Sequence, residues 1–102
     1  MPSNITPMFY FTYVLYSLRD GKHYIGYTNN LKNRLAEHYS GKSFSTAPRR
    51  PLRLIYFEAC LDQEDARQRE KYLKQTVGRR YLSRRLRSYR RKSGLETFAW
   101  LE

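Results

Sequence analysis

Cysteine, glycine, proline and acidic side chains are all scarce in this sequence of 102 residues. It has one cysteine, five glycines, four prolines and nine acidic residues. The single cysteine, Cys60, excludes an internal disulfide, and with only two histidines in the chain a structural zinc site is excluded as well. We therefore expect Cys60 to behave as a small buried hydrophobic residue.

Long apolar runs are also missing. The longest run, from Met8 to Leu18, is much shorter than the roughly 20 residues that a membrane span needs, and no basic residue precedes it as in a signal peptide. No membrane partner is expected. We expect a cytoplasmic protein.

Positive charge is abundant, because twenty Lys and Arg give a net charge of +11 and a pI near 10.1. Such a surface fits a polyanion, of which nucleic acid is the commonest. The length predicts one domain over residues 1–102, and 16% aromatic and 40% apolar residues support a folded core, which we place at about residues 8–92.

Two strands joined by a hairpin are predicted near the N-terminus. Residues 9–18 are nearly all apolar or aromatic, which is typical of a central strand covered on both faces. Asp20-Gly21 then separates this run from residues 23–28, and an Asp-Gly pair between two such runs predicts a two-residue turn. This turn pairs Leu18 with His23.

The same register pairs Tyr13 with Thr28 and places Tyr13, Tyr24 and Gly26 on one face of the sheet. Gly26 leaves room there for a phosphate to approach the backbone. The two tyrosines remain about 13 Å apart at the usual strand rise, so a bulge or a shifted turn is needed to bring their hydroxyls together. Ordinary packing is the alternative explanation for either tyrosine.

Three helices and a third strand follow. The caps and the apolar periodicity predict first a helix capped by Asn30 and ended by Gly41, with an apolar stripe at Leu31, Leu35, His38 and Tyr39. A polar loop over 43–51 and a strand over 52–59 follow. Next come a helix from 62 to about 76, with Gly78 as the break, and a basic helix over 79–92. Leu95, Phe98 and Trp100 are expected to fold back onto the body.

Glu70 occupies an unusual position for an acidic residue. On a helical wheel of residues 62–76 and beyond, it falls among Ala66, Leu73 and Val77, on the side that should face the core. A carboxylate at such a position needs a partner. Two interpretations stay open: Glu70 pairs with an arginine at the edge of the core, or it is a metal ligand or a general acid or base.

Arg34 and His38 lie one helical turn apart, on or beside the apolar stripe of the first predicted helix. Taken singly, His38 fits a hydrogen-bonded, half-buried histidine and Arg34 a solvated arginine. Together with Glu70 and the two tyrosines they supply a cation, a proton carrier, a carboxylate and phenols. Phosphodiester hydrolysis requires groups of these kinds.

The predicted C-terminal helix carries a row of arginines without acidic partners between residues 79 and 92. Ion pairs within the helix cannot explain such a row, so contact with nucleic-acid phosphates is the favoured interpretation. The residues expected to bind nucleic acid are Arg80, Arg84, Arg87, Arg91 and Lys74.

The order of these residues resembles the GIY-YIG nuclease domain over about residues 8–92. The resemblance rests on Tyr13, on the stretch Tyr24-Ile25-Gly26-Tyr27-Thr28, on Arg34 and His38, and on the downstream stretches Arg69-Glu70-Lys71-Tyr72-Leu73-Lys74 and Gly78-Arg79-Arg80-Tyr81-Leu82. It is closest to small single-domain members related to the nuclease domain of bacterial UvrC and to eukaryotic structure-specific resolvase subunits.

The resemblance implies an α+β fold, a three-stranded antiparallel sheet flanked by helices, and a metal-dependent endonuclease acting on DNA, in repair or on branched structures. It implies one Mg²⁺ or Mn²⁺ with Glu70 as the sole protein ligand, and no small-molecule cofactor. Arg34 would stabilise the charged transition state, and Tyr13 would activate water, alone or with His38. Tyr24 would orient the phosphate or the water.

The sequence departs from the family pattern at two points. The first half of the motif reads Phe11-Thr12-Tyr13, so only its tyrosine is kept, and the asparagine that some members carry after the glutamate is missing after Glu70. Two alternative functions remain: a module that binds DNA or RNA without turnover, and an enzyme or binding protein directed to RNA, since charge alone does not distinguish the two polymers.

Overall fold

β1 (Tyr10–Ser17) is the central strand of a three-stranded antiparallel sheet, between β2 (His23–Thr28) and β3 (Leu52–Cys60). The computed structural model describes residues 4–94. Every β1 side chain from Thr12 onward is buried, as predicted from its almost continuous apolar sequence. The predicted α+β class with a three-stranded antiparallel sheet is confirmed.

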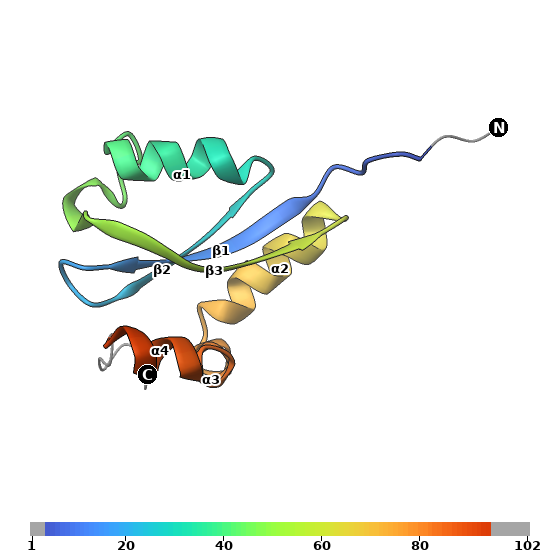
Figure 1. Ribbon diagram of the computed structural model, residues 1–102. Coiled ribbons are helices and arrows are strands. Elements are labelled where there is room, and N and C mark those ends of the chain that lie inside the picture. The colour runs from blue at the N-terminus through green and yellow to red at the C-terminus, as the bar shows by residue number, and fades with distance from the viewer. Residues whose placement is uncertain (1–3, 95–102) are drawn as a thin grey trace.

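The helices lie on the two faces of this sheet: the helix before β3 covers one face, and the helices after β3 lie on the other (Figure 1). α1 (Leu31–Ser40) covers one face, and a short 3₁₀ turn, η1 (Ala47–Arg49), leads from it into β3. The other face carries α2 (Gln63–Leu73), α3 (Thr76–Arg85) and α4 (Arg87–Ser93). The α1 boundaries confirm the predicted caps, because the Asn30 side chain accepts from the backbone N–H of Asn33 and Gly41 ends the helix with φ 86°.

The hydrophobic core lies between the sheet and the second group of helices. It is built around four buried side chains: Val14, Ile25, Leu73 and Leu82. The buried Thr12 hydroxyl donates to the carbonyl oxygen of Ala66 at 2.8 Å and so ties β1 to α2. Thr12 is one of the positions at which the sequence departs from the motif of the similar family. The bond gives this threonine a structural role, because its acceptor, Ala66, lies one helical turn before Glu70.

The predicted hairpin register is wrong by two residues. β1 pairs Tyr16 with His23 and Tyr13 with Gly26, so the connection is longer than an Asp-Gly turn. The Ser17 hydroxyl accepts from the backbone N–H groups of Arg19 and Asp20, and the backbone N–H of Leu18 donates to Pro51 rather than to β2. Leu18 is therefore lost from the strand pair, and this shifted turn brings Tyr13 nearer to Tyr24.

Two predicted helix boundaries also differ from the structure. α2 ends at Leu73, and Gly78 lies inside α3 rather than between helices. The predicted basic helix over 79–92 is divided at Leu86 (φ −108°, ψ 23°), where the chain turns between α3 and α4 (Figure 1). Leu86 packs against the core cluster at this turn, while the arginines on either side stay in solvent.

Three predicted side-chain environments are wrong. Cys60 is only partly buried and its thiol lies 3.4 Å from the carbonyl oxygen of Asp62. Tyr39 and Val77 are 47% and 50% exposed. Val77 belongs to α3, so the α2 helical wheel does not extend to it, and Tyr39 points away from the sheet in the last turn of α1. The predicted return of Leu95, Phe98 and Trp100 lies outside the described residues.

Gly78 lets α3 cross the end of α2 at backbone contact. A Cβ at this position would collide with the carbonyl oxygen of Tyr72 and the Cα of Leu73, and backbone cannot move aside as a flexible side chain can. Gly78→Ala should therefore destabilise the fold by about 1–3 kcal/mol, the usual cost of overpacking, although alanine is the better helix former by about 1 kcal/mol.

Urea unfolding of Gly78→Ala measures this effect, and the neighbouring Val77→Ala is the matched control. Val77 is half exposed, so its truncation should stay within about 0.5 kcal/mol of the wild type. A Gly78→Ala variant as stable as the wild type would show that the two helices do not depend on this contact.

Candidate active site

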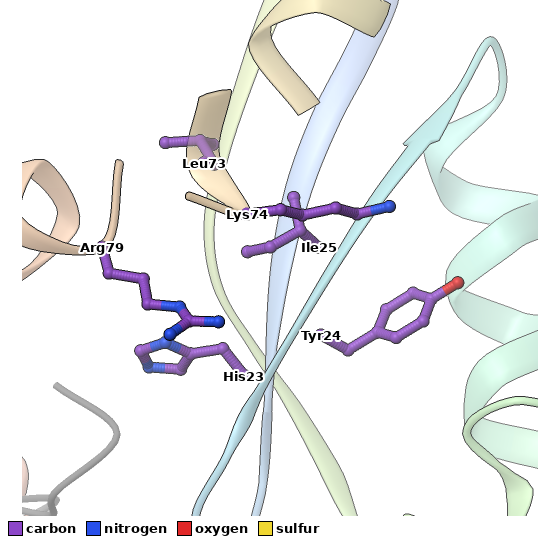
Figure 2. Close-up of a pocket in the computed structure, with 6 residues that line it drawn as sticks. All are labelled: His23, Tyr24, Ile25, Leu73, Lys74 and Arg79. Carbon is purple, nitrogen blue, oxygen red and sulfur yellow. The ribbon is translucent and has the colours of Figure 1, made fainter. Parts of the chain in front are cut away.

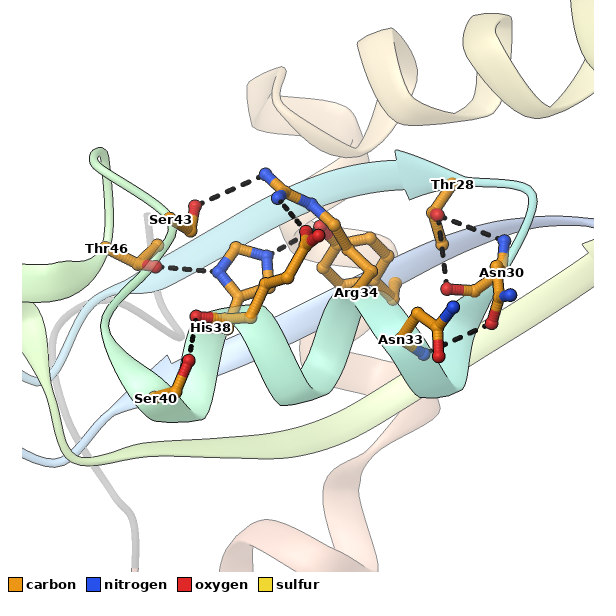
Figure 3. Close-up of polar contacts among 10 residues, drawn as sticks. Thr28, Asn30, Asn33, Arg34, His38, Ser40, Ser43 and Thr46 are labelled. Atoms are coloured by element: carbon orange, nitrogen blue, oxygen red, sulfur yellow. Dashed lines mark hydrogen bonds and ion pairs between the residues drawn. The ribbon is translucent and has the colours of Figure 1, made fainter.

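A buried chain of hydrogen bonds joins Tyr13, His38 and Thr46 between the sheet and α1. The Tyr13 hydroxyl lies 2.7 Å from His38 Nε2, and His38 Nδ1 lies 2.7 Å from the hydroxyl of Thr46 (Figure 3). Tyr13 is 1% exposed, and His38 and Thr46 are fully buried. Both nitrogens of the imidazole are therefore engaged, and the orientation of the ring is fixed.

Burial keeps both aromatic members of this chain uncharged at neutral pH. It raises the pKa of Tyr13 to about 12, although the Arg34 guanidinium acts in the opposite direction. It lowers the pKa of His38 to about 4, and the nearby Arg34 charge lowers it further. A neutral imidazole has one donor and one acceptor, so the direction of the whole chain is set by which nitrogen of His38 carries the proton.

Gly26 is the position at which the Tyr13 ring crosses β2. A Cβ on Gly26 would collide with the tip of that ring. We expected this glycine to admit a phosphate, but the space is filled by the phenol. Tyr24 lies on the same face, as predicted, with its ring centroid 6.4 Å from that of Tyr13 and 5.2 Å from that of His38.

Arg34 lies on α1 beside these rings and is held by two partners. It forms an ion pair with Glu37 at 2.7 Å, and its second terminal nitrogen donates to the Ser43 hydroxyl at 3.3 Å (Figure 3). The Glu37 carboxylate raises the pKa of Arg34 above its usual range. About a third of the side chain is exposed, so a fixed guanidinium faces solvent next to the Tyr13 hydroxyl.

Sequence analysis missed Glu37, Ser43 and Thr46. Ser43 and Thr46 lie in the segment that was interpreted as a polar loop, yet both are buried, and their hydroxyls bind Arg34 and His38. Polar composition alone does not reveal such hydroxyls, because their partners are on a different element. Glu37 could have been found from its spacing, since it follows Arg34 by three positions on a helix.

Glu70 is on α2, on the far side of the edge strand β2 from α1. Its carboxylate forms an ion pair with Lys74 Nζ at 3.1 Å, so its partner is a lysine one turn later and not an arginine. It lines a surface pocket with Tyr27 of β2, and its charge acts on the Tyr13 phenol by raising the pKa. The structure thus clusters Tyr13, Tyr24, Arg34 and His38, and it places Glu70 across β2 from them.

Lys74 and Tyr24 line the neighbouring pocket along the same edge of the sheet, and Figure 2 shows the lysine side chain extending across β2 toward the side of α1. His23, on the first residue of β2, lies in this pocket beside Arg79. Burial and the charge of Arg79 lower the pKa of His23 to about 4. The β2 edge is therefore bordered by cations on both sides of the Glu70 carboxylate.

The donor set at Glu70 fits a hard divalent cation that keeps most of its ligands from water and phosphate. Within residues 4–94, no three His, Cys, Asp or Glu side chains form a cluster that would enclose a metal. A single carboxylate supplies the oxygen ligand that Mg²⁺ or Mn²⁺ prefers. The Glu70 carboxylate oxygen is already paired with the ammonium of Lys74 at 3.1 Å, so a metal ion would replace this partner.

The arginines expected to bind nucleic acid are exposed, but they do not form one row. Arg80 and Arg84 belong to α3, and Arg87 and Arg91 to α4, beyond the turn at Leu86. Within residues 4–94, no carboxylate pairs with any of the four. As for lipid, the part of the chain that the structure describes has no helix with the length and apolarity needed to cross a bilayer.

Acid should destabilise the fold between about pH 6.5 and pH 4. His38 and His23 have pKa values lowered to about 4, whereas histidines of an unfolded chain titrate near 6.5. In this interval the unfolded chain binds more protons, so stability falls as the pH falls. Urea unfolding at pH 7.5 and 4.5 should differ by on the order of 2–3 kcal/mol for each histidine.

His38→Gln is the variant that separates the two histidines. The difference between its stabilities at the two pH values should be about half that of the wild type, whatever its absolute stability. An unchanged difference would show that His38 is not held neutral by the fold.

Comparisons with known proteins identify the family of the chain. The model of a family described as the GIY-YIG catalytic domain matches residues 9–86. Similar proteins named UPF0213 protein occur in Streptococcus pneumoniae serotype 4, with 45% identity over 65 residues, and in Bacillus licheniformis, with 44% over 66. A third, in Limosilactobacillus reuteri, is 40% identical over 73 residues.

These matches cover 63%, 64% and 69% of the chain, and 65%, 67% and 75% of the relatives, respectively. The chain therefore spans about two thirds of the length of the first two relatives. No solved structure matches it. Because the family model covers most of the sequence, residues 9–86, the chain belongs to the GIY-YIG catalytic domain family.

Proposed function

We propose that this protein is an endonuclease that hydrolyses DNA phosphodiester bonds with one Mg²⁺ or Mn²⁺ held by Glu70. The observation that carries the proposal is the cluster of Tyr13, His38 and Arg34, in which a buried proton-handling pair lies beside a fixed, solvent-facing guanidinium. A fold needs no such combination for packing. The charge and the hydrogen-bonding groups of this cluster match the needs of an attacking water and a phosphate.

Arg34 binds the phosphate in this mechanism. Glu37 and Ser43 hold two of its terminal nitrogens, which costs the side chain its rotational freedom before a ligand arrives. The remaining N–H donors of the planar guanidinium are directed at non-bridging phosphate oxygens, and they stabilise the charge that develops there. Lysine would supply the charge without this geometry.

Tyr13 and His38 handle the proton of the attacking water. A phenol with a pKa near 12 is protonated at neutral pH, so Tyr13 does not act as a preformed phenolate. With the His38 proton on Nδ1 and donated to Thr46, the Tyr13 hydroxyl donates to Nε2 and its oxygen accepts from water. As the water oxygen bonds to phosphorus, its proton moves to the phenol oxygen and the phenol proton moves to His38 Nε2, while the bond between phosphorus and the leaving oxygen breaks and that oxygen takes a proton from solvent.

Glu70 would hold the metal once Lys74 has left its carboxylate. A metal held by Glu70 would supply positive charge to the phosphate oxygens and lower the pKa of a bound water. When Lys74 leaves the carboxylate, its ammonium is free to contact a phosphate from the β2 edge. Tyr24, on the α1 side of the same strand, orients the phosphate or the water. We propose that its substrates are repair intermediates or branched DNA, and that the protein acts in the cytoplasm, on the nucleoid.

Glu70→Gln should raise the metal concentration needed for cleavage at least tenfold or abolish cleavage, because the amide keeps the volume and removes the charge that binds a hard cation. Cleavage is measured in single turnovers on single-stranded, duplex, flapped and branched DNA, over a titration of Mg²⁺ or Mn²⁺. Direct Mn²⁺ binding without DNA should weaken as well. DNA binding without metal should be unchanged or slightly tighter.

Glu64→Gln is the matched control. Glu64 is on the same helix and lines the same surface pocket as Glu70, so the Glu64→Gln substitution removes an equal charge from the same part of the surface. It should keep the wild-type metal dependence. Cleavage by Glu70→Gln with wild-type metal dependence would overturn the assignment, and binding of every DNA without cleavage of any would favour a module without turnover. Preference for a matched RNA would redirect the activity to that polymer.

Binding to DNA should weaken steeply with salt, because exposed arginines on α3 and α4 neutralise phosphates. About 4 to 6 contacts give a log–log slope of roughly −4 to −5, and Arg84→Ala/Arg87→Ala should flatten it by about 2. Anisotropy of labelled DNA between 50 and 300 mM salt measures the slope. Lys32→Ala, which removes a charge from α1, should leave it unchanged; an unchanged slope in the double variant would place the DNA elsewhere.

A further inference from the structure

Phe44 is a large apolar side chain that the fold leaves almost entirely in solvent, with 95% exposure. It lies between α1 and η1, in a loop whose neighbouring residues Ser43 and Thr46 are buried. An aromatic ring is normally covered, because removing its surface from water is favourable. This ring is instead presented outward by two residues that anchor its loop in the protein.

The loop around Phe44 is fixed by hydrogen bonds on both sides. The backbone N–H groups of Lys42 and Ser43 donate to the carbonyl oxygen of Glu37, and the backbone N–H groups of Thr46 and Ala47 donate to the carbonyl oxygen of Ser43. The exposure of Phe44 therefore belongs to an ordered turn. Because the loop backbone is already ordered, covering the ring costs little backbone conformational freedom.

The same loop contacts the candidate active site at two points. The Ser43 hydroxyl accepts from Arg34, and the Thr46 hydroxyl is bonded to His38 (Figure 3). Phe44 follows Ser43 directly, so its ring emerges next to the group that holds the phosphate-binding arginine of the proposed mechanism. A nucleic acid whose phosphate is bound by Arg34 would therefore pass close to the loop that carries this ring.

The surroundings of Phe44 are positively charged. Lys42 and Arg50 flank the loop in sequence and both are exposed, and the chain as a whole has a net charge of +11. The partner should therefore combine negative charge with a flat apolar face. An unpaired nucleotide has both features, whereas the bases of a duplex are already stacked on one another inside the helix.

We propose that Phe44 stacks on an unpaired base next to the phosphate at Arg34, so that the site selects DNA with unpaired nucleotides over continuous duplex. This inference rests on the proposed function. It assigns the choice of substrate to a residue outside the proton-handling cluster, and it explains why an apolar ring is fixed in solvent beside that cluster. Stacking tolerates any sequence, because each base has an aromatic face.

Binding without divalent metal tests the inference. Anisotropy in EDTA is measured for a single strand, a flapped duplex and a blunt duplex, with the wild type, Phe44→Ala and Phe44→Trp. Phe44→Ala should weaken binding of the single strand and the flap about tenfold or more, the scale of one lost base stack, and leave the blunt duplex unchanged. Phe44→Trp should keep the preference, and its added fluorescence should be quenched by the single strand.

Phe9→Ala is the matched control, since Phe9 is also an exposed aromatic and lies just before β1, away from the loop. It should bind all three DNAs like the wild type. Equal weakening of all three DNAs by Phe44→Ala, or no weakening of any, would overturn the inference. The inference would also be overturned if Phe44→Ala bound DNA like the wild type but lost binding to anionic lipid vesicles. The same holds if it bound DNA like the wild type but lost a dimer that the wild type forms in sedimentation.

These outcomes are distinct from failure of the proposed function. The binding assay needs neither metal nor turnover, so a protein without nuclease activity would still show the effect of Phe44. Conversely, normal metal-dependent cleavage together with Phe44→Ala binding equal to the wild type would leave the nuclease in place and remove Phe44 from substrate selection.

Discussion

The Tyr13 ring lies over a backbone position that has no side chain, and the other clustered residues are arranged around that contact. Only glycine at position 26 lets the phenol cross β2, and only a phenol at that depth reaches the imidazole of His38. The length of the side chain then sets the separation between the sheet and α1. Once α1 is at that separation, Arg34 is beside the hydroxyl, because it precedes His38 by one helical turn on the same helix.

The other half of the site is positioned from the opposite face by different contacts. Thr12 bonds α2 to the central strand, and Gly78 lets α3 pack against the end of α2 without a gap. Together they hold α2 against the sheet so that Glu70 borders the edge strand β2. A single strand of the sheet thus separates the carboxylate from the phenol, and both faces of the sheet contribute to one edge.

Sequence patterns predicted the elements whose signals are local. Asn30 and Gly41 define α1 through bonds within a few residues of themselves, and Tyr13 and Tyr24 keep their shared face because the register differs from the predicted one by an even number of residues. The register itself was not predictable from Asp20-Gly21, because the Ser17 hydroxyl and Pro51 take backbone N–H groups that a short turn would have used.

Residues whose partners are distant in sequence were also missed. Gly78 has the sequence signature of a helix break, and only the crossing of α2 shows that it is a contact inside α3. Ser43 and Thr46 look like ordinary loop residues until α1 is placed next to them. The partner of Glu70 was within reach of sequence reasoning, since Lys74 follows it by four positions on a helix, the spacing at which such pairs form.

In the proposed mechanism, the ion pair between Glu70 and Lys74 couples the binding of the metal ion to the binding of the phosphate. Lys74 can neutralise the carboxylate of Glu70 or an incoming phosphate, but its one ammonium cannot fully neutralise both. A phosphate that attracts Lys74 leaves Glu70 more negative and so strengthens its hold on a cation. By thermodynamic reciprocity, a cation on Glu70 releases the lysine and strengthens the hold on phosphate by the same factor. Cooperativity between metal and nucleic acid then arises from one shared side chain, with no movement of the backbone.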